Sequence, residues 1–96
     1  MKLEKIKEIL KKHKKELQEN FKIKNIGIFG SYVRGEQREA SDVDILVEFY
    51  ETPDLLKFIE LERYLEEILG VKVDLVRKQA IREELRERIL KEVVSV

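Results

Sequence analysis

The chain has 96 residues, with 20 basic and 20 acidic side chains, and its formal net charge is zero. This balance argues against a protein that grips long nucleic acid, because such proteins carry an excess of positive charge. The absence of cysteine excludes disulfides, thiol catalysis and cysteine-ligated zinc. No Gly-, Ser- or Pro-rich linker divides residues 1–96, so we expect a single domain. The N-terminus carries no apolar run, so we expect a cytoplasmic protein without a signal peptide or membrane span.

The first predicted element is an amphipathic helix over residues 2–18. Its apolar positions recur at helical spacing and include Leu3, Ile6, Leu10 and Leu17. The first fifteen residues are strongly basic, which a solvated helix face explains more simply than a binding site does. The one histidine, His13, falls in step with the apolar positions, so we expect it to pack or to lie at their edge and not to act as a base or ligand.

Six further elements follow in chain order. The sequence predicts strands over 24–29, 42–49 and 71–76, and helices over 31–35, from 52–54 to 69, and over 79–93. In the two later strands, aliphatic residues take one face and aspartates take the other. The order predicts an α+β fold, with a small mixed sheet of three to four strands and helices mainly on one face. The aspartate face would then be free for chemistry. The apolar tail 93–96 should pack back on the domain or, alternatively, meet a partner chain.

Three aspartates are candidate metal ligands. Asp42 and Asp44 stand at i and i+2 on one strand and should project side by side, about 6 to 7 Å apart at their Cα atoms. Mg²⁺ takes oxygen ligands, usually one or two carboxylates plus substrate phosphates. Asp74, the only aspartate in another strand pattern, could complete a clamp for two metal ions in phosphoryl or nucleotidyl transfer. Taken singly, each of these aspartates could be ordinary polar surface.

The segment Gly30-Ser31, placed before a short helix, is a candidate phosphate-binding turn. Backbone N–H groups and the Ser31 hydroxyl would face phosphate oxygens. The segment lacks the Gly-x-x-x-x-Gly-Lys-Ser/Thr pattern of a P-loop, and such a turn taken alone is usually structural. Arg34 either touches phosphates or pairs with a nearby carboxylate to hold the turn, and Tyr32 either stacks on a base or packs its helix. The turn and the aspartates together indicate a site for a nucleoside triphosphate and a divalent metal.

The segments Gly30–Gly35 and Ser41–Asp44 carry a family resemblance. They resemble the signature of the polymerase-β-like nucleotidyltransferase superfamily, and the length and ending of the chain resemble its minimal, MntA-type members. The resemblance covers nearly the whole chain and implies a palm-like fold. It also implies that Gly30 and Ser31 hold the triphosphate of ATP. Two Mg²⁺ would be held by the aspartates at 42, 44 and 74, and Asp74 would be the base for the attacking hydroxyl. Tyr32-Val33 stands where Phe-Ala is common, a difference that bears on the nucleotide pocket.

The resemblance also implies a partner. Family members of this size are typically paired with a HEPN-domain RNase toxin, which implies an antitoxin that transfers AMP from ATP to a tyrosine of that toxin. A domain this small cannot enclose a substrate, which also favours a macromolecular partner. Two alternatives remain open: a binding antitoxin with a vestigial site, and nucleotidyl transfer to a small molecule. Addition to RNA ends is the least favoured, because the net charge is zero.

Overall fold

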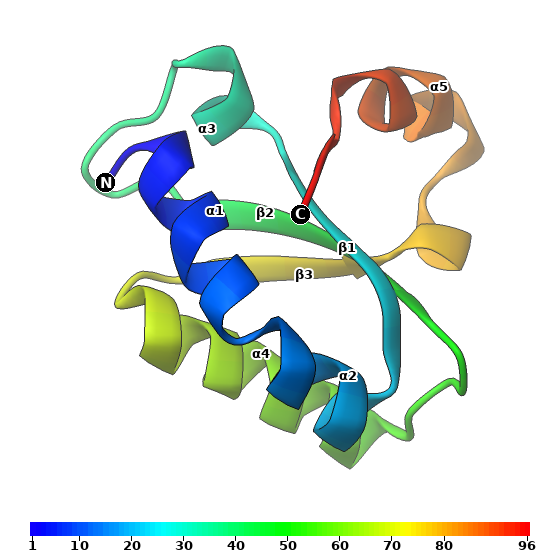
Figure 1. Ribbon diagram of the computed structural model, residues 1–96. Coiled ribbons are helices and arrows are strands. Elements are labelled where there is room, and N and C mark those ends of the chain that lie inside the picture. Colours follow the sequence, from blue (N-terminus) through cyan, green and yellow to red (C-terminus); the bar gives the residue numbers. More distant parts are fainter.

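In a computed structural model, residues 1–96 form a four-stranded mixed sheet with helices packed on it (Figure 1). The strands are β1 (Ile23–Phe29), β2 (Val43–Phe49), β3 (Val73–Arg77) and β4 (Val94–Ser95). The helices are α1 (Leu3–Lys12), α2 (Lys14–Phe21), α3 (Ser31–Arg34), α4 (Leu55–Leu69), the 3₁₀ turn η1 (Lys78–Ala80) and α5 (Glu83–Glu92). The strand order is β3-β2-β1-β4, with β2 parallel to β3 and β1 antiparallel to both β2 and β4. The predicted small mixed sheet is confirmed.

Three helices, α1, α2 and α4, cover one face of this sheet (Figure 1). The aliphatic positions of the strands point toward them, and all are buried: Ile26, Ile28, Val43, Ile45, Val47, Val73 and Leu75. Because side chains alternate along a strand, this pattern sends the intervening residues of β2 and β3 to the other face. The main core therefore decides which face of the sheet carries the aspartates.

The second face is not entirely free, which corrects the sequence-based expectation. Helix α5 packs on it through a small buried cluster of Phe29, Leu46, Ile81 and Ile89. The sequence predicted the last helix without indicating which side of the sheet it covers. Leu46 follows Asp44 by two residues and lies on the same face, so α5 covers the middle of the aspartate face. Asp44 is half-buried there, and Asp42 and Asp74 remain exposed.

Several boundaries differ from the prediction. Helix α4 begins at Leu55, after its cap Asp54, and not at 52–54, and the third strand is Val73–Arg77 and not 71–76. The expected helix 2–18 is two helices, because the chain turns at His13, whose Nδ1 lies 2.9 Å from the Ile9 carbonyl oxygen. The expected helix 79–93 is divided into η1 and α5 by extended backbone at Ile81 and Arg82, where Ile81 enters the second cluster. The central helix ends before Gly70 as predicted. No helix combines the length and the apolar character that crossing a membrane would need.

The C-terminal tail packs back on the sheet, as expected, and it does so as a strand. In β4, Val94 pairs with Ile28 and Ser95 with Gly27, and the Val96 N–H donates to the Ile26 carbonyl at 3.0 Å. Lys14 adds a hydrogen bond from its Nζ to the Val96 backbone oxygen at 3.1 Å. The tail therefore ties α5 to the centre of the sheet.

Gly27 permits this close approach. A Cβ at position 27 would lie 2.6 Å from Val93 Cγ2 and 3.0 Å from the Val94 carbonyl oxygen. We expect Gly27→Ala to lower the free energy of unfolding by about 1 to 3 kcal/mol, because the tail must shift to admit the methyl group. Urea denaturation measures the change. The cost should be smaller in a Val93→Ala background, and an unchanged unfolding midpoint in the single variant would contradict this account.

Candidate active site

The site is built on the parallel pairing of β2 with β3. Asp44 of β2 stands opposite Asp74 of β3 in the register, so both carboxylates leave the sheet on the same face and side by side. Asp44 is half-buried and Asp74 is exposed. Asp42 lies two residues upstream, just before β2 begins, and is exposed. The negative charge of Asp42 helps to raise the pKa of the Asp44 carboxyl.

Gly30 brings the predicted phosphate turn against the first of these carboxylates. It follows β1 with φ 81° and ψ −153°, a backbone conformation that residues with a Cβ rarely adopt. A methyl group at this position would overlap Asp44 Oδ2. The turn and the carboxylate are thus in contact only because residue 30 has no side chain. The sequence placed these two groups near each other, and the structure places them in direct contact.

The pKa of Asp44 is raised from 3.8 to about 6. Burial is the largest cause, followed by the charge of Asp74 and a hydrogen bond shared with it, and then by the charge of Asp42. Arg34 acts in the opposite direction. A carboxylate whose charge is opposed by two neighbouring carboxylates is stabilised by a cation placed among them.

The donor set suits a metal ion that takes part of its coordination from a substrate. No three acidic or histidine side chains converge closely enough to hold an ion by themselves. Mg²⁺ does not require such a cage, since it commonly binds one or two carboxylates together with phosphate oxygens and water. Asp44 and Asp74, with Asp42 beside them, offer hard oxygen ligands on one accessible face. These residues therefore fit Mg²⁺ bound together with a nucleotide phosphate.

Ser31 begins α3 directly after Gly30, and Arg34 ends it. The Gly30 carbonyl accepts from the N–H groups of Val33 at 3.0 Å and Arg34 at 3.2 Å, which closes the short helix. Tyr32 between them is 4% exposed and donates its hydroxyl to the Ser41 carbonyl at 3.3 Å. Of the two roles open for Tyr32, packing of α3 is therefore the one observed.

Arg34 pairs with two carboxylates. Its Nε donates to Glu36 at 2.9 Å, and its Nη1 donates to both oxygens of Glu92 at 2.8 and 3.1 Å. Hydrogen bonds to Glu36 and then Glu92 raise the pKa of Arg34, which keeps it charged. Glu92, which also accepts from the Gly30 N–H, is the residue that sequence reasoning missed. The sequence offered one indication of its role: Glu92 is an acidic residue in the last turn of a helix, where the helix dipole disfavours a negative charge.

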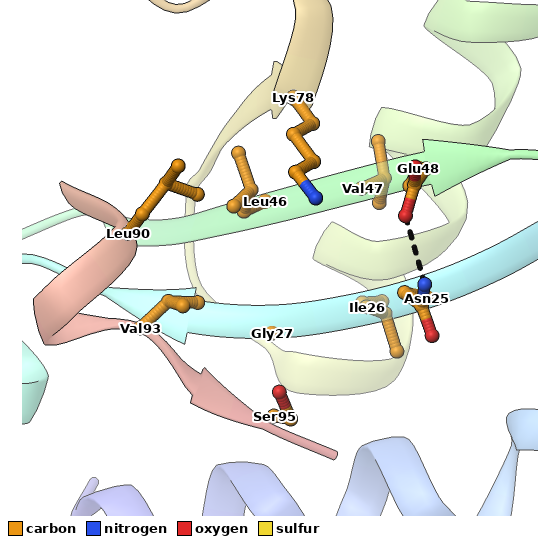
Figure 2. A pocket seen from close by; sticks show the side chains of 10 residues that line it. All are labelled: Asn25, Ile26, Gly27, Leu46, Val47, Glu48, Lys78, Leu90, Val93 and Ser95. Atoms are coloured by element: carbon orange, nitrogen blue, oxygen red, sulfur yellow. Dashed lines mark hydrogen bonds between the residues drawn. The ribbon is translucent and has the colours of Figure 1, made fainter. Parts of the chain in front are cut away.

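Two shallow hollows flank α5 on this face. One, of about 260 Å³, lies beside Asp74 and is mainly apolar, with Phe29, Val76, Ala80, Ile81, Arg82, Leu85 and Ile89 as its other lining residues. Figure 2 shows the second, of about 270 Å³, which is lined by Gly27, Leu46, Lys78, Leu90 and Val93 among others. There Asn25 donates to Glu48 at 2.8 Å, and no aspartate lines the space. The first hollow is the one adjacent to the carboxylates.

The sequence of this chain is similar to a known protein family and to several of its members. Residues 10–96 match the profile of the family described as nucleotidyltransferase domain. The protein adenylyltransferase MntA of Thermococcus cleftensis is 60% identical over 94 residues, which are 98% of this chain and 95% of that protein. The Methanocaldococcus jannaschii protein MJ1215 is 71% identical over 79 residues, which are 82% of this chain and 92% of that protein.

Solved structures agree with this match. One described as a minimal nucleotidyltransferase superposes with a TM-score of 0.83 at 36% identity, over 100% of this chain and 97% of that one. A chain of a toxin–antitoxin complex with AMP-PNP gives 0.74 at 32% identity, over 88% and 69% of the two chains. A chain of the complex between tri-AMPylated Shewanella oneidensis HEPN toxin and MNT antitoxin gives 0.68 at 27%, over 94% and 70%. The chain therefore belongs to the nucleotidyltransferase domain family of enzymes, and within it to the minimal, MntA-type nucleotidyltransferases.

Proposed function

We propose that this chain is a metal-dependent enzyme that transfers AMP from ATP to a hydroxyl group, specifically a tyrosine hydroxyl, of a HEPN-type toxin. It would thereby act as the antitoxin of a toxin–antitoxin pair in the cytoplasm. The observation that carries the proposal is the carboxylate pair Asp44 and Asp74, held on one face with the Gly30 turn in contact with Asp44. The relatives support it, since one is named a protein adenylyltransferase and others are solved with AMP-PNP or with an AMPylated HEPN toxin.

The roles follow from position. Ser31 and Arg34, at the two ends of α3, would hold the triphosphate. Gly30 would contribute the shape of the turn, since its own N–H donates to Glu92. The aspartates at 42, 44 and 74 would hold two Mg²⁺. When bound, these ions would neutralise phosphate charge and stabilise the attacking and leaving oxygens. The acceptor hydroxyl oxygen forms a bond to the α-phosphorus, the bond from that phosphorus to the bridging oxygen breaks, and pyrophosphate leaves.

In this proposal Asp74 is the general base, which accepts the proton of the acceptor hydroxyl. This carboxylate is exposed, so a side chain from another protein can reach it, whereas Asp44 is half-buried against Gly30. The apolar hollow beside Asp74 would receive the ring of the acceptor tyrosine. A base within hydrogen-bond reach of the hydroxyl would raise its nucleophilicity as the new bond forms.

Labelled ATP tests the transfer directly. The chain is incubated with Mg²⁺, a purified HEPN-domain protein and ATP labelled at either the α- or the γ-phosphate. We expect label on the HEPN protein from the α position only, because pyrophosphate leaves. Asp42→Asn/Asp44→Asn should reduce labelling by at least about 100-fold, since removal of groups that stabilise transition-state charge has effects of this size.

The matched control is Asp54→Asn. Asp54 caps α4 by accepting from the Lys57 N–H at 2.8 Å, and asparagine caps helices equally well. It follows the end of β2, whereas Asp44 lies at the start of that strand. This variant should label the HEPN protein like the parent. Toxin neutralised without label would instead make the chain a binding antitoxin, and label found only on small molecules would exclude a protein acceptor.

Stability against pH tests the metal site without any acceptor. Because the folded pKa of Asp44 lies above the unfolded value of 3.8, the folded state holds its proton longer, and stability falls as pH rises from about 4 through about 6. With a chelator at pH 7.5, Asp44→Asn should therefore stabilise the protein by about 1 to 2 kcal/mol, a value reduced to allow for partial exposure. The gain should vanish near pH 4.

Mg²⁺ with ATP should reverse this order. A ligand that binds only the folded state raises the melting temperature of the parent, and Asp44→Asn should gain less from it. Thermal melts at both pH values, with chelator or with Mg²⁺ and ATP, measure all four combinations. An Asp44→Asn variant that is less stable than the parent in chelator at pH 7.5 would contradict the cost that burial and the neighbouring carboxylates impose on the charge of Asp44.

A further inference from the structure

Glu92, in the last turn of α5, contacts both ends of the candidate phosphate turn. Its carboxylate accepts from the Gly30 N–H at the start of α3 and from Arg34 Nη1 at the end of α3. The Glu92 side chain is 16% exposed, against 44% for Arg34. By contrast, the neighbouring pair of Glu87 and Lys91 on the same helix is 83% and 75% exposed. Glu92 is thus the one acid of this helix that is committed to a contact inside the fold.

The backbone of Glu92 is fixed from both sides. Three residues before it, Ile89 is buried in the second cluster with Phe29 and Leu46. Two residues after it, Val94 pairs with Ile28 in the sheet. The backbone thus holds Glu92 next to the turn, and its carboxylate could leave Gly30 and Arg34 only by rotation of the side chain. An anion at the C-terminal end of a helix is disfavoured by the helix dipole, so its tertiary partners must hold it there.

Arg34 keeps a free edge in this arrangement. A guanidinium carries five N–H donors, on Nε, Nη1 and Nη2. Glu36 takes Nε and Glu92 takes Nη1, while Nη2 makes no hydrogen bond to the protein. The two carboxylates therefore fix the guanidinium plane without using all of its donors. A phosphate oxygen can bind Nη2 while Glu92 stays in place.

We infer that Glu92 is a positioning residue, which orients Arg34 and the Gly30 turn for the triphosphate and so makes the C-terminal helix part of the active site. The inference rests on the proposed function in so far as the turn binds ATP. Glu92 itself touches no substrate and acts through Arg34 and Gly30.

The test measures ATP binding by the full chain with Mg²⁺ and without any acceptor. Glu92→Gln keeps the size of the side chain and one acceptor for the Gly30 N–H, but it loses the charge that pairs with Arg34. We expect its dissociation constant for ATP to rise about tenfold, the effect of one lost charge-assisted hydrogen bond. Glu87→Gln, on the same helix and away from the turn, should bind ATP like the parent. Glu92→Asp retains the charge on a shorter side chain, so it should also weaken binding, and it serves if Glu92→Gln does not fold.

A double variant separates positioning from general stability. If Glu92 acts through Arg34, then Arg34→Lys/Glu92→Gln should bind ATP no more weakly than Arg34→Lys alone, because coupled residues do not add. Additive losses, or unchanged ATP binding with only a lower urea midpoint, would overturn the inference. Tighter binding by Glu92→Gln would also overturn it, since the carboxylate would then be competing with phosphate for the same donors.

The outcomes distinguish this inference from the proposed function. ATP binding that weakens in Glu92→Gln, in a chain that never labels a HEPN protein, would keep the positioning role and reject the acceptor. Failure of the parent chain to bind ATP would reject both.

Discussion

The parallel register between β2 and β3 is the constraint on which the core and the site both depend. It places Asp44 opposite Asp74, and it places Val43 and Ile45 opposite Val73 and Leu75. Since side chains alternate with a period of two, a slip of one residue would exchange the faces, burying the aspartates under the helices and exposing the core. The burial of the aliphatic face thus selects the register, and the register in turn assembles the carboxylates. The pairing that buries the core therefore also brings the carboxylates together.

The same register places two carboxylates side by side at one end of the sheet, which is electrostatically unfavourable. Asp44 lies half-buried between Asp74 and the Gly30 turn, and its pKa is raised to about 6, first by burial and then by the charge of Asp74. Carboxyl groups with perturbed pKa values cluster at functional sites, where a bound ligand can offset the cost of burying and crowding their charges. Arg34 offsets part of the repulsion, while Glu36 and Glu92 hold its guanidinium in turn. Arg34, at the end of the turn, therefore links the aspartates to Glu92 in the C-terminal helix.

Local rules predict most of this fold, and they fail where distant segments meet. Neighbouring residues determine the alternation of side chains in β2 and β3 and the end of α4 before Gly70. Both features are observed as predicted. The turn at His13 was missed because apolar spacing continues through it to Leu17. The contact of Glu92 with Gly30 joins residues 62 positions apart, and no local pattern encodes it. For the same reason the sequence placed Gly30 near Asp44 but did not reveal that a side chain at position 30 would collide with it.

The size of the site explains why a protein acceptor is the natural substrate class in our proposal. The hollow beside Asp74 has about 260 Å³, below the range of about 300 to 1,000 Å³ in which pockets enclose most of a ligand. Asp74, the base in our proposal, is exposed, so water has access to it in the isolated chain. An acceptor protein that covers this face would complete the walls and exclude that water, which strengthens every charge interaction at the turn. Transfer would then be fast only while the partner is docked, because the partner would supply the walls that exclude water from the site.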